Sequence, residues 1–279
     1  MIMHVLRCAG PGAYRSLVLL LAAALLSSSC TTVPGVPRAA RSELAPTGKL
    51  RVGLFNRNPV YVTQDHGGNE LQGVAPDLGR ELAKRLGVDF EAIRYPNIIR
   101  MLEGAKTDEW DVAFLGIDPT RAVDIEYAAE YMEDDYTYLV SADSPVQSIG
   151  DADRPGHRIV VAKGGVGDLF LTRSLKQAEL LRVSEITTST LELLSSGAAQ
   201  AVVWNRPALL GLSVSLPGSR VVEGRFYGAP LGLAVVKGRP AGTVYVRDFI
   251  EEAKASGLVQ QAIQRANLHG ATAAAPASK

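Results

Sequence analysis

The chain has 279 residues, which is enough for one large domain or for two lobes. It carries 29 Lys and Arg residues against 29 Asp and Glu residues, and this balance argues against a nucleic-acid-binding protein, which would show a basic excess. Hydrophobic residues make up 47% and charged residues 21% of the chain, which excludes intrinsic disorder and is typical of a globular protein.

The N-terminal segment predicts a secretory signal. Arg7 and Arg15 supply positive charge, and residues 17–26 form a short apolar run. Because a membrane-spanning helix needs about 20 apolar residues, this run fits the core of a signal peptide better than a membrane span. Residues 27–30 (Ser-Ser-Ser-Cys) resemble the lipobox of bacterial lipoproteins, in which the cysteine is acylated and becomes the new N-terminus, although Ser27 stands where that motif usually has Leu.

We therefore predict a lipoprotein signal peptide over residues 1–29 and lipidation of Cys30, with the protein anchored to a membrane outside the cytoplasm. The alternative is ordinary cleavage near Ser29, which would leave Cys30 as a free thiol. Residues 30–47 are rich in Thr, Pro, Ala and Arg without hydrophobic periodicity, which predicts a flexible tether. Residues 270–279 are rich in Ala, Pro and Ser and predict a disordered tail.

Strands and helices alternate through the body of the chain. The clearest helix is predicted over residues 73–87, because Pro76 suits the first helical position, Asp77 complements the positive N-terminal end, and Gly87 ends the helix. Three leucines spaced by four residues share one face of it. The other elements predicted in this half are strands at 49–55, 88–94, 111–116 and 136–140 and a helical face that starts at Ile98.

A second alternating unit follows. Its predicted elements are strands at 157–162, 181–183, 201–204 and 227–236 and helices that end near residue 176 or span 191–197 and 244–267. Alternating strands and helices predict parallel sheets that are covered on both faces. We therefore predict an α/β fold of two lobes with a ligand cleft between them, lobe 1 over residues 48–134 plus 229–269 and lobe 2 over residues 135–228.

Four segments in this order carry a family resemblance. They are residues 73–86, with Gly-Val-Ala-Pro-Asp-Leu at their start, residues 111–127, with Pro-Thr-Arg in their middle, Lys163-Gly164-Gly165, and the return strand from Tyr227 to Gly238. Over residues 48–268 the chain resembles the family 3 extracellular solute-binding proteins, the receptors of polar amino-acid ABC importers. The resemblance implies the two-lobed periplasmic-binding-protein fold of type II, a small solute in the cleft, an ABC permease as partner and no cofactor.

Arg121 is the first candidate ligand-binding residue. It follows the C-terminal end of a predicted strand, where α/β sheets bind ligands, and a guanidinium can grip a carboxylate with two parallel hydrogen bonds. The resemblance implies that Arg121 holds the carboxylate of the ligand. The alternative is an exposed surface arginine.

Gly164 and Gly165 are the second candidates. A glycine-rich turn between a strand and a helix can leave backbone N–H groups free to hold an anionic group. The alternative is a turn that only needs a positive φ. The family commonly has a hydroxyl residue at the place of Gly165, so a side-chain hydrogen bond is missing here.

Two further positions depart from the family pattern. Gly116 stands where the family usually offers Ser or Thr, and Asn205 stands where the family has an acid for the ligand's ammonium group. Asp118 and Glu223 are candidates to replace that acid, although neither matches the family's ammonium site. An unpaired buried ammonium is costly, so we predict a carboxylate-bearing solute without a free α-amino group, or one whose amine is acylated or displaced.

Aromatic residues complete the predicted site. Phe55 and Tyr61 follow the first strand, where the resemblance implies aromatic walls of the ligand site, although either residue could equally be a packing residue. Trp204 lies in an apolar strand and is expected in the core.

The sequence offers little enzyme chemistry. It contains no G-x-S-x-G, H-E-x-x-H, C-x-x-C or Walker motif, and the histidines after the predicted signal, His66, His157 and His269, lack ligand spacing, so we predict neither catalytic residues nor a metal site. The prediction is a monomeric solute-binding protein that does not bind nucleic acid. The alternatives are a cyclohexadienyl dehydratase-like enzyme, which would share the fold, and a sensory binding module.

Overall fold

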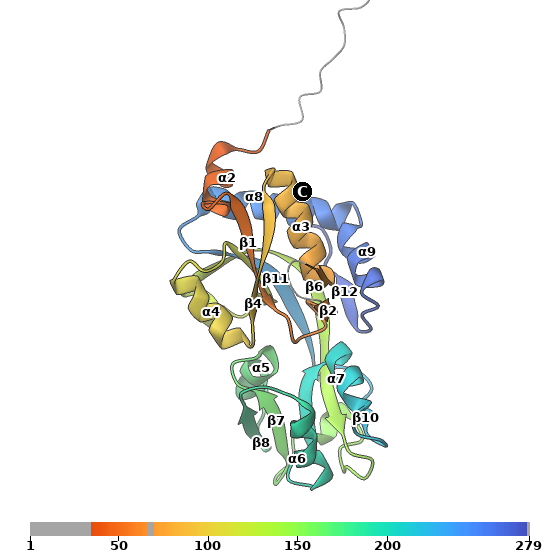
Figure 1. Ribbon diagram of the computed structural model, residues 1–279. Coiled ribbons are helices and arrows are strands. Elements are labelled where there is room, and N and C mark those ends of the chain that lie inside the picture. Colours follow the sequence, from red (N-terminus) through yellow and green to blue (C-terminus); the bar gives the residue numbers. More distant parts are fainter. Residues whose placement is uncertain (1–34, 66–69, 278–279) are drawn as a thin grey trace, which may run out of the picture. The chain divides into compact units, whose positions relative to one another are not determined.

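One mixed sheet holds the body of the chain together in the computed structural model, which describes residues 35–65 and 70–277 (Figure 1). Residues 36–279 form one unit, which contains all of the helices and strands named below. The predicted signal peptide and Cys30 lie outside the described residues. Along the sheet the strands follow the order β4-β1-β5-β11-β6-β9-β7-β8, and the short strands β10 and β12 also pair with β6.

The first part of the sheet is parallel. The strand β1 (Lys49–Phe55) lies between β4 (Asp89–Tyr95) and β5 (Val112–Gly116) and pairs with both in parallel register. The helices α3 (Val74–Leu86) and α4 (Ile98–Lys106) connect these strands. We call β1, β4, β5 and the helices packed on them the first lobe.

The helix α3 forms where the sequence predicts it. Pro76 lies in its first turn, Gly87 adopts a left-handed conformation with φ of 66° and ends it, and Leu78, Leu82 and Leu86 are buried. The left-handed conformation is favourable for glycine because it has no Cβ. The amphipathic spacing therefore directs one face of α3 into the core of the first lobe.

A second parallel group repeats the pattern. The strand β7 (Arg158–Ala162) lies between β8 (Glu179–Val183) and β9 (Ala201–Asn205), again in parallel register. The helices that accompany these strands are α5 (Val166–Ser174), α6 (Leu191–Ser195) and α7 (Arg206–Ser213). We call these elements the second lobe.

Two long antiparallel strands join the lobes. The strand β6 (Ile125–Val140) pairs with β11 (Tyr227–Val236) along its length and with β9 near its end, while β11 also pairs with β5. Both strands therefore run from one lobe to the other (Figure 1). The sequence predicts only the last part of β6, from residue 136, because the acidic residues before it obscure the strand pattern.

The remaining elements lie around this framework. They are α2 (Arg38–Leu44), β2 (Gln64–Asp65), β3 (Leu71–Gln72), η1 (Pro119–Arg121), η2 (Ile149–Asp151), η3 (Thr188–Thr190), β10 (Arg220–Val221), α8 (Pro240–Ala255), α9 (Leu258–Arg265) and β12 (Ala271–Ala273). Within the two described ranges, no helix has both the length and the apolar character needed to cross a membrane.

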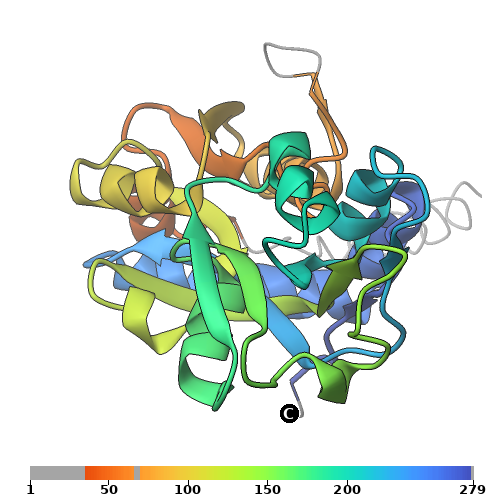
Figure 2. The same cartoon turned by 90° about the horizontal axis from the view of Figure 1, so that it is seen from below.

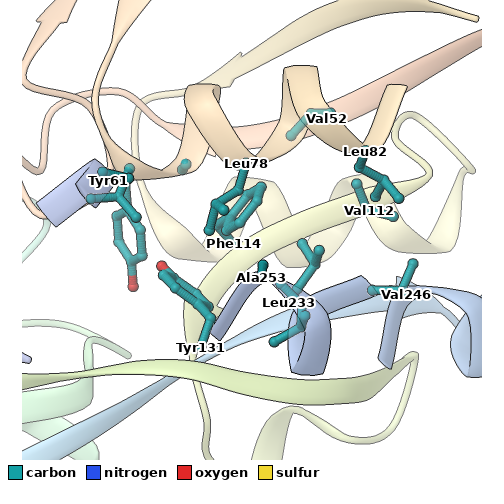
Figure 3. Packing of buried hydrophobic residues seen from close by; sticks show 14 of the residues in the cluster. Val52, Tyr61, Leu78, Leu82, Val112, Phe114, Tyr131, Leu233, Val246 and Ala253 are labelled. Atoms are coloured by element: carbon teal, nitrogen blue, oxygen red, sulfur yellow. The ribbon is translucent and has the colours of Figure 1, made fainter. Parts of the chain in front are cut away.

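Helices cover both faces of the sheet, as predicted (Figures 1 and 2). On β5, Val112 and Phe114 point into a core shared with α3, α8 and α9, while Ala113 and Leu115 point into a core shared with α4. This alternation follows from the two-residue period of a strand. Figure 3 shows Leu78 of α3 against Phe114, whose ring meets that of Tyr131 edge to face at 5.4 Å between centroids.

The structure differs from the predicted tether. Residues 38–44 of the predicted tether form the helix α2, whose Ala40 and Leu44 are buried and which packs against α8. The carboxylate of Glu43 accepts a hydrogen bond of 2.7 Å from the backbone N–H of Gly242. Composition alone predicted a flexible segment, because only two apolar side chains attach this short helix to the body.

The predicted disordered tail also differs. Residues 271–273 form the strand β12, which pairs antiparallel with β6. A sheet edge accepts any sequence that can supply backbone hydrogen bonds, so a short run of Ala and Thr suffices. The lobe boundaries stay a prediction.

Candidate ligand-binding site

A cavity of about 410 Å³ lies where the two lobes meet. Its walls come from the segments that end or follow β1, β4, β5, β7, β8 and β9. In open α/β sheets ligands bind outside the carboxyl ends of the strands, and this cavity occupies that place in both lobes at once. The residues that line the cavity include Phe55, Arg57, Asn58, Tyr61, Arg121, Tyr136, Lys163, Gly165, Asp168, Glu185 and Trp204.

Arg121 lines the cavity and joins the lobes. Asp118 caps the turn η1 (Pro119–Arg121), and its side chain accepts a hydrogen bond from the backbone N–H of Thr120. The side chain of Arg121 is buried, with 6% exposure; Nη1 donates to the carbonyl of Gly116 at 2.7 Å, and Nη2 donates to the carbonyl of Gly164 at 2.9 Å. Its buried Nε has no hydrogen-bond partner in the described part of the chain. The predicted surface alternative is therefore wrong for Arg121.

Gly116 shapes the site without lining the cavity. Its carbonyl accepts hydrogen bonds from Arg121 and, at 2.8 Å, from the hydroxyl of Tyr127. A Cβ at this position would lie 2.2 Å from Cγ2 of Val166 in the second lobe. Glycine in place of the family's hydroxyl residue therefore lets Val166 pack directly against the first lobe.

The glycine-rich turn is arranged differently from the predicted anion site. Gly164 has φ of +70°, and its N–H donates to the carboxylate of Asp168 at 2.9 Å. The N–H of Gly165 donates to the carbonyl of Ala162 at 2.9 Å. Both amides therefore have acceptors within the turn and are not free to hold an anionic group. The positive φ of Gly164 fits the alternative that the sequence left open, a turn that only needs this backbone conformation.

Asn205 lies buried at the start of α7. Its Oδ1 accepts a hydrogen bond of 3.0 Å from the N–H of Ala208, which caps the helix, and its Nδ2 donates to Oδ1 of Asn58 at 2.8 Å. Asn58 belongs to the first lobe and lines the cavity, and its Oδ1 also accepts from the N–H of Val60. Both polar atoms of the Asn205 side chain are therefore engaged with protein groups.

The carboxylate of Asp118 is also bonded to protein groups. Its carboxylate accepts hydrogen bonds from Thr120, and from Nη2 of Arg173 in the second lobe at 2.9 Å. Burial opposes ionisation of this carboxyl, but the hydrogen bonds from Thr120 and Arg173 outweigh it and lower its pKa. Glu223, the other candidate for the ammonium site, is exposed and is not among the described residues that line the cavity.

The aromatic residues that the sequence singled out do line the cavity. Phe55 ends β1, and Tyr61 follows it with 4% exposure, so burial raises the pKa of its hydroxyl. Trp204 was expected in the core, and the structure instead places it between the core of the second lobe and the cavity. Tyr136 on β6 also lines the cavity and was not predicted.

Asn58 and Lys163 are two further lining residues that sequence reasoning did not place in the site. Asn58 follows the end of β1 and Lys163 follows the end of β7. Their position after parallel strands was a usable signal, because that edge of an α/β sheet is the usual ligand side. In the part of the chain that the structure describes, no three or more His, Cys, Asp and Glu side chains are grouped so as to hold a metal ion.

A cavity between two α/β lobes that share two long strands defines a two-lobed binding protein. The family model of bacterial extracellular solute-binding proteins, family 3, matches residues 50–267, and the chain belongs to this family. Membership in an extracellular family places its working site outside the cytoplasm.

Individual relatives are more distant. Cyclohexadienyl dehydratase from Pseudomonas aeruginosa is 28% identical over 178 residues, a match that spans 61% of this chain and 64% of the relative. The chain thus matches less than two thirds of that enzyme's length.

Solved structures of the same fold include amino-acid-binding proteins. An ancestral amino acid-binding protein, described as a precursor of cyclohexadienyl dehydratase, has a TM-score of 0.68 at 24% identity over 81% of this chain and 97% of that chain. A solute receptor for L-cysteine of Neisseria gonorrhoeae has a TM-score of 0.68 at 23% identity over 82% of this chain and 92% of that chain. These likenesses show the fold.

Proposed function

We propose that this protein captures a small carboxylate-bearing solute outside the cytoplasm and delivers it to an ABC transporter. The observation that carries the proposal is Arg121, a buried guanidinium that lines the interlobe cavity and has no carboxylate partner in the described ranges. Burying a cation without an anion is unfavourable, and a ligand carboxylate removes that penalty. Nε has no partner among the described residues, and Nη2 donates one of its two hydrogens to the carbonyl of Gly164. These two nitrogens form the edge of a guanidinium that a carboxylate takes in a bidentate contact.

None of the described residues that line the cavity offers an unpaired acid to an α-ammonium group. Asn205 is neutral and both of its polar atoms have protein partners. The two acids that line the cavity, Asp168 and Glu185, are paired with Arg182 and Arg57. A positively charged amine would therefore enter without a free counter-ion, which supports a solute whose amine is absent or acylated.

The solute also secures closure. Arg121 already contacts the carbonyl of Gly164 in the opposite lobe, so a carboxylate that binds Arg121 and touches the second lobe adds contacts to the closed state. A ligand shifts such an equilibrium by its difference in affinity for the two states.

A screen of small carboxylates by thermal shift tests the proposal. A ligand that binds only the native state raises the melting temperature. We expect carboxylates to raise it in the wild type, and the same compounds to have no effect on Arg121→Ala. Amides of the same acids serve as neutral controls. Stabilisation by the amides and the acids alike would contradict a carboxylate site.

We further propose a membrane anchor through lipid on Cys30, supported by the apolar run and the small residues before that cysteine. Acyl chains together with other contacts hold a protein at a membrane surface. Cys30→Ser is expected to release the protein or to leave an unprocessed precursor. A fully soluble and unmodified wild type, measured by mass spectrometry, would disprove the anchor.

The second candidate function is a cyclohexadienyl dehydratase-like reaction, which the relative in Pseudomonas aeruginosa favours. Such chemistry needs a general acid or base that faces the cavity. Asp168 and Glu185 are the acids in that position, and each is paired with an arginine. Incubation with prephenate or arogenate distinguishes the two functions, since turnover would establish the enzyme and binding without turnover the receptor.

A further inference from the structure

The charges around the cavity do not balance. Within the described part of the chain, five charged side chains line it: Arg57, Arg121, Lys163, Asp168 and Glu185. Arg57 and Glu185 pair with each other across the two lobes. Asp168 pairs with Arg182 at 2.9 Å and accepts the N–H of Gly164. Both acids are thus neutralised by protein cations.

Arg121 and Lys163 are the two cations left over. Arg121 donates only to backbone carbonyls, and Lys163 has no ion pair or side-chain hydrogen bond among residues 35–65 and 70–277. The two belong to opposite lobes, but the chain brings them together, because Nη2 of Arg121 lies 2.9 Å from the carbonyl of Gly164, the residue after Lys163.

The backbone around Lys163 is fixed. Its N–H donates to the carbonyl of Val183 at 2.8 Å, and the following glycine is held by Asp168 and by Arg121. The ammonium group is exposed and has a flexible stem, so it can reach a ligand at the cavity rim. Arg121 offers a buried guanidinium and Lys163 an exposed ammonium to the same cavity.

We propose that the solute is a dianion, whose first carboxylate binds Arg121 and whose second anionic group binds Lys163. This inference rests on the proposed function and names its substrate class. A second anionic group on the ligand would attract Lys163 of the second lobe while the first carboxylate is bound to Arg121 of the first lobe. It therefore favours the closed state as well as binding.

Titration calorimetry with the purified protein tests the proposal. The probes are the unbranched dicarboxylates from malonate to adipate, and the monomethyl ester of each keeps the length of the acid with a single charge. We expect at least one dicarboxylate to bind about fivefold or more tightly than its ester, the scale of a partly exposed charge pair. This preference should shrink as salt is added.

Two variants assign the preference to Lys163. In Lys163→Gln the ratio of diacid to ester affinity should fall towards one while the affinity for the ester is kept. Lys176→Gln removes an exposed lysine of the second lobe that does not line the cavity, and it should leave the ratio unchanged. Melting temperatures close to that of the wild type check the folding of both variants.

The possible results separate the two proposals. Esters that bind as tightly as the diacids, or a preference that survives Lys163→Gln, would overturn the dianion and leave the carboxylate receptor standing. Absence of binding by every diacid and ester, with no thermal shift from any carboxylate, would overturn both.

Discussion

Nδ2 of Asn205 donates a hydrogen bond of 2.8 Å to Oδ1 of Asn58, and both side chains are buried where the lobes meet. Asn205 stands where the resemblance places an acid for an amino-acid ligand. In this protein the position instead links the lobes to each other. Asn205 therefore replaces an acid that could recognise an ammonium group, and the same hydrogen bond holds the two lobes together.

Asn205→Asp should destabilise the protein and change its ligand preference. An aspartate can still cap α7, but it cannot donate to Asn58, and two oxygen acceptors would face each other. We expect a loss of about 1–3 kcal/mol of unfolding free energy, the cost of an unsatisfied buried polar group. In an Asn58→Ala background the same change should cost less. Thermal or urea denaturation measures both, and equal costs in the two backgrounds would contradict the pairing.

Gly116→Ala should weaken ligand binding by opposing closure. The added Cβ would meet Cγ2 of Val166 at 2.2 Å, so the lobes must separate or the strand must shift. Overpacking of this kind costs about 1–3 kcal/mol. The double variant with Val166→Ala removes the clash and should recover the affinity. Calorimetry of the wild type and the two variants measures the effect, and a double variant as weak as Gly116→Ala would show that the clash is not the cause.

Asp134 should make stability depend on pH. It lies buried on β6, neither carboxylate oxygen has a hydrogen-bond partner within the described ranges, and burial together with the nearby charge of Asp135 raises its pKa well above 3.8. The folded state therefore holds a proton that the unfolded state releases, so this residue lowers stability as the pH rises above its unfolded pKa. Asp134→Asn removes the penalty.

The variant should gain stability relative to the wild type as the pH rises from about 4, near the unfolded pKa of an aspartate, into the neutral range, with little difference at the acidic end. Urea denaturation across this range measures the effect. Parallel pH profiles for Asp134→Asn and the wild type would contradict it. Glu126→Gln, which removes an exposed acid of the same strand, controls for the general loss of an acid in β6.

Arg121→Lys should weaken binding of the solute even though the charge is kept. An ammonium cannot reproduce the two parallel hydrogen bonds of a guanidinium. Truncation to Ala should cost about 2–5 kcal/mol of affinity, the range for a buried charge pair. Arg173→Lys is the matched control, because Arg173 also links the lobes but bonds to Asp118 and does not line the cavity. Equal losses in the two lysine variants would contradict a specific role for Arg121.

Strong local patterns made most of the fold predictable. The first strand and the return strand have the predicted bounds, because charged and apolar residues alternate at the start of the first and the second is an apolar run. The early part of β6 was missed, since it includes the acids Glu130, Glu133 and Asp134. Periodicity treats an acid as exposed, whereas Asp134 is buried by its strand neighbours.

The site was predictable where it depends on the carboxyl ends of strands. Arg121, Phe55, Tyr61 and Gly165 line the cavity as expected from their places in the chain. The bond between Asn205 and its partner Asn58 was not predictable, because it joins loops that are remote in sequence and adjacent only after the lobes meet. Pairwise contacts across the cleft depend on tertiary geometry that local sequence does not encode.

Isothermal titration of the wild type with matched two-substituted acids tests the central claim most directly. Each set holds the carbon skeleton and the carboxylate constant and varies the group at the second carbon as amino, hydroxy, oxo or hydrogen. A cavity with Arg121 as its carboxylate site and no free acid predicts binding of hydroxy, oxo or unsubstituted acids and weak binding of the amino acids. Submicromolar binding of an unmodified α-amino acid to the wild type would contradict the account.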